Sequence, residues 1–219
     1  MDQSLTDARI MRRCVELSAQ AVAQGELPFA CVICRDDVIV TEAINRVTAS
    51  GDVTRHAEIV AISEAQRVLG RSDLSDCTIY SNVEPCPMCS FPIRETKMRR
   101  VVYAISSPMM GGWSKWNVLG DNEISNAMPE MFGVAPEVAA GLNYREAAAV
   151  WRKWNPVFWL GIRLRGCLAD PASDGVHLVL QARQADRHPV RRLLARVAQL
   201  ARGKRAPAAA VSVQPELPS

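Results

Sequence analysis

The segments His56-Ala57-Glu58 and Pro85-Cys86-Pro87-Met88-Cys89 restrict the fold and the chemistry of this sequence more than any others. A catalytic zinc ion takes three protein ligands and leaves a fourth position for water, and one His with two Cys is a known ligand set. The segments therefore predict one zinc ion per subunit, with His56, Cys86 and Cys89 as its ligands. Glu58 is not needed for coordination, and a carboxylate beside activated water can carry a proton, which makes Glu58 the candidate catalytic residue.

A purely structural zinc site is the main alternative. Such a site normally has four Cys or His ligands, and only three lie near these segments. Cys31 and Cys34 have the spacing of a CxxC pair, but they belong to the apolar run Phe29-Ala30-Cys31-Val32-Ile33-Cys34. An offset of three along a strand points two side chains to opposite faces, so both thiols are expected in the core. The pattern favours the catalytic interpretation.

Apolar residues at helical spacing predict that a helix begins near Thr54 and ends at Gly70, with His56 and Glu58 in its first turn. A strand is predicted over Cys77–Ser81, and a short helix that the metal-site cysteines open is predicted to run to Glu95. The positive end of a helix dipole lowers the pKa of a thiol, which favours the thiolates that a metal needs.

The order of elements predicts the fold class. A helix over Leu5–Ala23 precedes the strands Phe29–Cys34 and Val38–Ala43, which a tight hairpin joins, and a later strand is expected over Arg100–Ala104. Alternating strands and helices after a hairpin predict a three-layer α/β/α sandwich with a mixed sheet. The starts of the two metal-bearing helices can then meet at one end of that sheet.

Four segments carry a resemblance to a known family: Gly25-Glu26-Leu27-Pro28-Phe29-Ala30, Asn45, His56-Ala57-Glu58-Ile59 and Asn82-Val83-Glu84-Pro85-Cys86-Pro87-Met88-Cys89. From about Leu5 to Tyr103 the chain resembles the cytidine deaminase-like superfamily of CMP/dCMP-type zinc deaminases. Within it, the chain is most similar to the branch of guanine deaminases and tRNA wobble-adenosine deaminases. The resemblance implies hydrolytic removal of an exocyclic amine, a homodimer, and a proton shuttle at Glu58. It also implies that the Asn45 side chain and the Ala57 amide bind the base, with Phe29 lining the pocket.

Beyond Ala104 the likeness is weaker, and the choice of substrate stays open. The wobble deaminases carry an acidic, lysine-containing loop where this chain has residues 106–117. Trp113 and Trp116 in this loop could stack on a base, or they could pack in the core or at a subunit interface. The first hypothesis is a zinc hydrolase that acts on a small aminated heterocycle of the guanine or cytosine type. The alternatives are a tRNA wobble adenosine deaminase and a non-catalytic zinc-stabilised interaction module.

Composition and charge limit the location and the partners. The N-terminus lacks a secretory signal pattern, and no apolar run reaches the roughly 20 residues of a membrane helix, so a cytoplasmic protein without membrane contact is expected. Residues 170–219 hold eight basic and four acidic side chains, against eighteen and nineteen in the rest. The near-neutral body does not indicate a tRNA-binding surface. The predicted organisation is a deaminase domain at 1–165, a linker at 166–186, and a basic amphipathic helix with a disordered tail at 187–219.

Overall fold

The computed structural model describes residues 3–171. Its helices are α1 (Gln3–Ala23), α2 (Val47–Ser50), α3 (Ala57–Leu69), α4 (Pro87–Glu95), α5 (Asn122–Ala127), α6 (Tyr144–Trp154) and α7 (Pro156–Leu164). Its strands are β1 (Ala30–Arg35), β2 (Val38–Ile44), β3 (Cys77–Val83), β4 (Arg100–Ile105) and β5 (Glu137–Ala140). The predicted helix and tail at 187–219, and the predicted linker beyond residue 171, lie outside the described residues.

The five strands form one mixed sheet in the order β2-β1-β3-β4-β5. β1 is antiparallel to β2 and to β3, whereas β3, β4 and β5 are parallel. Arg35 pairs with Val38, so the β1–β2 hairpin has a two-residue loop. Asp36 and Asp37 fill that loop with φ of 47° and 64°. Positive φ at both positions is the conformation that matches the right-handed twist of the two strands.

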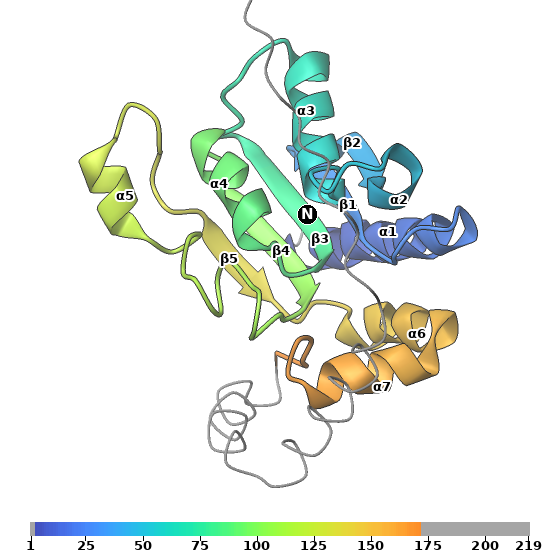
Figure 1. The fold of residues 1–219 in the computed structure, drawn as a ribbon. Coiled ribbons are helices and arrows are strands. Elements are labelled where there is room, and N and C mark those ends of the chain that lie inside the picture. The colour runs from blue at the N-terminus through green and yellow to red at the C-terminus, as the bar shows by residue number, and fades with distance from the viewer. Residues whose placement is uncertain (1–2, 172–219) are drawn as a thin grey trace, which may run out of the picture. The chain divides into compact units, whose positions relative to one another are not determined.

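Helices cover both faces of the sheet, and the alternation of side chains along the strands decides which face each residue joins. Val32 and Cys34 pack with α1 and α6, whereas Cys31 and Ile33 pack with α3. Figure 1 shows α3 and α4 together over the same part of the sheet, with α6 and α7 in a separate group. This arrangement confirms the predicted three-layer α/β/α sandwich, and the two thiols of the CxxC pair are core residues on opposite faces, as the sequence predicted.

The directions of the strands bring four segments that are distant in sequence to one end of the sheet. β2, β3 and β4 run in the same direction and end at Ile44, Val83 and Ile105, while β1 begins there because Ala30 pairs with Ile44. The residues just outside the strands at this end of the sheet are therefore 29, 45, 84 and 106. Carboxyl ends of strands are the usual place for a site in sheets of this kind.

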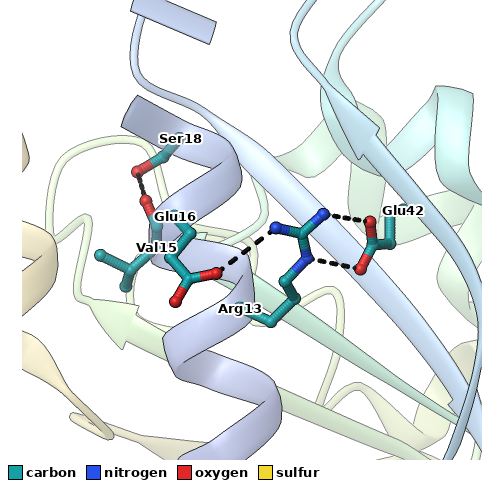
Figure 2. Close-up of polar contacts among 5 residues, drawn as sticks. All are labelled: Arg13, Val15, Glu16, Ser18 and Glu42. Carbon is teal, nitrogen blue, oxygen red and sulfur yellow. Dashed lines mark hydrogen bonds and ion pairs between the residues drawn. The ribbon is translucent and has the colours of Figure 1, made fainter. Parts of the chain in front are cut away.

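A bidentate ion pair fastens α1 to the edge strand β2. Arg13 Nε and Nη2 donate to the two carboxylate oxygens of Glu42 at 2.8 and 2.7 Å, and Arg13 Nη1 also reaches Glu16 at 3.3 Å (Figure 2). The planar guanidinium matches the carboxylate, which fixes the direction of the contact more than a single bond would. Because the pair is partly exposed, its contribution to stability is small, about 0–1 kcal/mol.

Aromatic side chains pack α6 and α7 against the end of the sheet where the four segments meet. Trp151 is almost fully buried, packs edge-to-face on Phe29 at 5.1 Å between ring centroids, and contacts Trp159 from α7 at 6.2 Å. Aromatic pairs of this kind add about 0.5–1.5 kcal/mol beyond the area they bury. The packing of α6 therefore supports the position of Phe29.

Two helix starts differ from the sequence prediction by a few residues. His56 has φ −64° and ψ 151° and caps α3, so the helix begins at Ala57 and only Glu58 of the predicted pair lies in its first turn. The second metal-bearing helix begins at Pro87, because Cys86 is its extended N-cap and proline is favoured at the first helical position. Among the helices described, none has the length and apolar character needed to cross a membrane.

Candidate metal centre

The three predicted ligands meet at one point. Among residues 3–171, His56, Cys86 and Cys89 form the group whose ligand atoms all lie within 4.8 Å of one another. His56 Nδ1 is 3.6 Å from Cys86 Sγ and 3.5 Å from Cys89 Sγ, and the two sulfur atoms are 3.6 Å apart. Tetrahedral zinc with bonds of about 2.3 Å to sulfur and about 2.0 Å to nitrogen separates its ligand atoms by about 3.5–3.8 Å. The donor set and its spacing therefore fit a zinc ion.

Local backbone geometry explains how two short segments reach the same point. His56 and Cys86 are both extended N-cap residues, so their side chains lie just before the first turns of α3 and α4. Cys89 is the third residue of α4, one turn after Cys86, and residues three apart lie on the same side of a helix. Three ligands on two adjacent helix starts need no long loop to hold them.

The two thiols differ in acidity. The contact with the Cys89 thiol, together with the neighbouring His56 ring, lowers the pKa of Cys86 to about 4. The same pairing, with burial, raises the pKa of the Cys89 thiol. The His56 pKa is raised chiefly by its contact with Cys86. Two thiols in contact with each other and with an imidazole suit a divalent cation, which would favour the deprotonated form of both thiols.

Glu58 is buried beside the candidate metal ligand Cys89. Its carboxylate accepts from Ser81 Oγ at 3.3 Å and lies 3.6 Å from Cys89 Sγ. Burial raises the pKa of Glu58 above its ordinary value, because the charged form loses hydration. The side chain is close to the metal ligands without completing their set, which is the position that a proton carrier needs.

A cavity of about 150 Å³ opens over the ligands. It is lined by Phe29, His56, Glu58, Val83, Glu84, Cys86, Ser107, Met110 and Leu168. Drug-sized ligands occupy pockets of about 300–1,000 Å³, so this space suits a smaller molecule. The predicted substrate contact Phe29 lies in the wall, whereas the other three, Asn45, Ala57 and Trp113, are not among the lining residues.

Asn45 is buried, and the carboxylate of Glu26 holds its side chain. Asn45 Nδ2 donates to Glu26 Oε2 at 2.8 Å, and the same carboxylate accepts from the amides of Thr48 and Ala49. Burial acts to raise the pKa of Glu26, but these amides outweigh it and hold the pKa below its usual range. Because the amide nitrogen faces Glu26, the orientation of the Asn45 side chain is fixed.

Glu84 is a second buried carboxylate, and it organises the loop after β4. It accepts from the amides of Ser107 at 2.6 Å, Trp113 at 3.0 Å and Ser114 at 2.7 Å, and from Ser114 Oγ at 2.9 Å. A Cβ at Gly111 would overlap the Glu84 carboxylate, so the loop needs glycine to approach it this closely. These contacts hold Ser107 and Met110 in the cavity wall.

Sequence reasoning missed the role of Glu84 and of Leu168. Glu84 stands two residues before Cys86, and an acidic residue directly after an apolar strand was an available signal. Leu168 offered no signal, because it is one apolar residue far from the motif in sequence. Trp113 is partly exposed and its indole lies against Gly120, so its predicted contact with a base stays a prediction.

Comparison with known proteins extends this picture. Residues 4–105 match the family model for the cytidine and deoxycytidylate deaminase zinc-binding region. The guanine deaminase of Bacillus subtilis (strain 168) is 43% identical over 95 residues, which are 43% of this chain and 61% of that protein. The tRNA-specific adenosine deaminase of Aquifex aeolicus is 32% identical over 108 residues, 49% of this chain and 72% of that protein.

A solved structure is similar over a longer part of the chain. It comes from studies of A-to-I editing by tRNA:A34 deaminases and aligns with a TM-score of 0.57 at 28% identity, covering 65% of this chain and 99% of the other. The match to the Bacillus subtilis protein, in contrast, spans less than two thirds of that protein's length.

Proposed function

This chain belongs to the cytidine deaminase-like family, and from that premise we propose that it hydrolyses the exocyclic amine of a small aminated heterocycle, with guanine as the first candidate. The observation that carries the proposal is the His56, Cys86 and Cys89 cluster with the Glu58 carboxylate beside it, below a cavity of about 150 Å³. The reaction replaces a carbon–nitrogen bond by a carbon–oxygen bond and releases ammonia.

The residues divide the chemistry between them. Zinc, when bound by the three ligands, would lower the pKa of water from about 15.7 to about 7. Glu58 takes a proton from the attacking water and delivers it to a ring nitrogen of the base. It then takes the remaining proton of the added hydroxyl group and passes it to the amine, so that the C–N bond breaks as the C=O bond forms and ammonia leaves. Phe29 forms an apolar wall against the flat ring, and Asn45, fixed by Glu26, is the proposed polar contact to the base.

Two observations support a small substrate over a tRNA. The identity to the guanine deaminase is 43%, against 32% for the tRNA-specific adenosine deaminase. Charge gives the second reason, since residues 1–169 hold eighteen basic and nineteen acidic side chains. A protein that binds an anticodon loop gains much of its affinity from phosphate contacts, and each one steepens the salt dependence by about 0.7 for single strands.

The test is ammonia release from guanine, cytosine and related aminated heterocycles by the zinc-loaded full chain at low and moderate salt. We expect turnover of at least one free base, with a rate that changes little with salt. Inosine formation in a tRNA anticodon stem-loop, suppressed steeply by salt and with all free bases inert, would instead assign the tRNA activity. Zinc binding without ammonia release from any of these would indicate the interaction module.

A further inference from the structure

Leu168 reaches the cavity from a part of the chain outside the family match. The match ends at residue 105, whereas three residues in the wall, Ser107, Met110 and Leu168, come later in the sequence. Leu168 is 4% exposed and lies in the same wall as Phe29 and Val83. The matched part thus supplies the metal ligands and Glu58, and the later part supplies one side of the space above them.

Backbone hydrogen bonds fix the position of Leu168. Ser106 and Ala169 exchange two backbone bonds, with N to O distances of 3.1 and 2.9 Å, which extends the end of β4. Ser107 Oγ donates to Cys167 O at 3.0 Å. The short segment that leads from α7 back to this point, residues 165–169 (the return from α7), turns at Gly166, whose φ is +70°. Leu168 therefore stands between two residues that are each bonded to the β4 end, so its side chain has little freedom to leave the cavity.

The same anchor holds both later parts of the wall. Ser107, which bonds to Cys167, donates its amide to Glu84 Oε2 at 2.6 Å. Glu84 in turn holds the loop that carries Met110. The loop after β4 and the return after α7 are therefore one connected wall, built on a carboxylate two residues from a metal ligand.

We propose that Leu168 is a specificity-determining residue, which limits the size of the substituents that a substrate can carry on its ring. The proposal rests on the function proposed above and names the side chain that selects among substrates for that chemistry. Removing part of the Leu168 side chain should admit ring-alkylated bases, and enlarging it should exclude them, while the metal and Glu58 are left in place.

The test compares guanine with guanine alkylated on a ring nitrogen, at N7 or at N9, in the full-length zinc-loaded protein. For each variant, the measured quantity is kcat/KM for the alkylated base divided by kcat/KM for guanine, which does not depend on the fraction of active enzyme. We expect this ratio to rise at least about tenfold in Leu168→Ala, to rise less in Leu168→Val, and to fall in Leu168→Phe, since a methylene in a pocket is worth about 10–200-fold.

Leu164→Ala is the matched control. Leu164 is the last residue of α7, is 73% exposed and is not part of the wall, so its ratio should equal that of the wild type. Equal ratios in Leu168→Ala, Leu168→Phe and the wild type would overturn the proposal. Calorimetric titration of the same bases into each zinc-loaded variant gives the size order from binding alone, so the proposal is tested even if the wild type turns over none of them, which would refute only the proposed function.

Discussion

Glu58 shares its surroundings with the metal ligands but makes different contacts. The carboxylate is hydrogen-bonded by Ser81 and lies beside Cys89, while the histidine nitrogen and the two sulfur atoms already have the spacing of a three-ligand set. The roles of Glu58 and the metal ligands can be distinguished by experiment, because loss of a ligand lowers the zinc content whereas loss of a proton carrier lowers the rate alone.

Exchanging Glu58 for glutamine should separate these roles. We expect Glu58→Gln to keep its zinc and its fold while losing at least about 10² in the rate of ammonia release, because an amide cannot carry the proton. Cys86→Ala should lose the metal, because two ligands remain. Zinc content by elemental analysis and ammonia release measure the two effects, and equal loss of zinc in both variants would make Glu58 a ligand.

At the scale of elements, one carboxylate ties α1 to the sheet. Asp7 on α1 accepts from Tyr80 Oη on β3 at 2.6 Å and from Arg100 on β4 at 2.7 Å, and Arg100 also bonds to Glu137 on β5 at 3.0 Å. Burial acts to raise the pKa of Asp7, but the bonds from Tyr80, Gln3 and Arg100 outweigh it, so its pKa in the folded protein is lowered.

This network predicts how stability depends on pH. A carboxyl with a lowered folded pKa stabilises the fold above its unfolded pKa of about 3.9, and that contribution is lost as the pH falls through the folded value. We expect Asp7→Asn to cost about 1–3 kcal/mol in the free energy of unfolding at pH 7, a difference that shrinks below about pH 4. Denaturant titrations between pH 7 and pH 3 measure it.

Glu137→Gln is the control for this prediction. Glu137 bonds to the same Arg100, but its side chain is 70% exposed, so the expected loss is at most about 1 kcal/mol. A loss in Asp7→Asn that is no larger than in Glu137→Gln, or that does not change with pH, would contradict the role given to Asp7.

The elements that the sequence predicted well are those with a strong apolar pattern. The strands at Val38, Cys77 and Arg100 begin at the residues where they were expected. α2, α5, β5 and α7 were not predicted. α2 and β5 have four residues each and α5 has six, and α7 begins at Pro156, with only Asn155 between it and the end of α6. Short edge elements are specified by what they pack against, which a local pattern does not contain.

At the scale of the whole molecule, the sequence indicated which candidate metal ligands lie together better than it indicated the shape of the cavity. The ligands and Glu58 lie in two short segments whose residue types and spacing are set by coordination chemistry. The wall of the cavity is built from residues between positions 29 and 168. Ser107, Met110 and Leu168 belong to it because the parallel strands β3 and β4 end at the same end of the sheet. That information lies in the register of the sheet. The homodimer and the cytoplasmic location stay predictions.

Two truncations test where the functional unit ends. A chain cut after Asp170 retains every residue of the cavity wall, and we expect it to fold, bind zinc and release ammonia at a near wild-type rate. A chain cut after Arg165, the predicted domain boundary, should still bind zinc but lose at least about tenfold in kcat/KM, because Leu168 and the backbone bonds of Cys167 and Ala169 to the end of β4 are missing. Thermal unfolding, zinc analysis and ammonia release measure both, and equal activity of the two chains would contradict the expectation.

The position of Leu168 also orders events during synthesis. Cys89 and Leu168 are 79 residues apart in sequence, so a ribosome that adds about 5–20 residues per second completes the metal ligands about 4–16 s before it adds Leu168. Throughout that interval the nascent chain carries both cysteines and the histidine but lacks one residue of the cavity wall. The candidate metal ligands are therefore synthesised first, and the cavity wall can be complete only after residue 168 has been added.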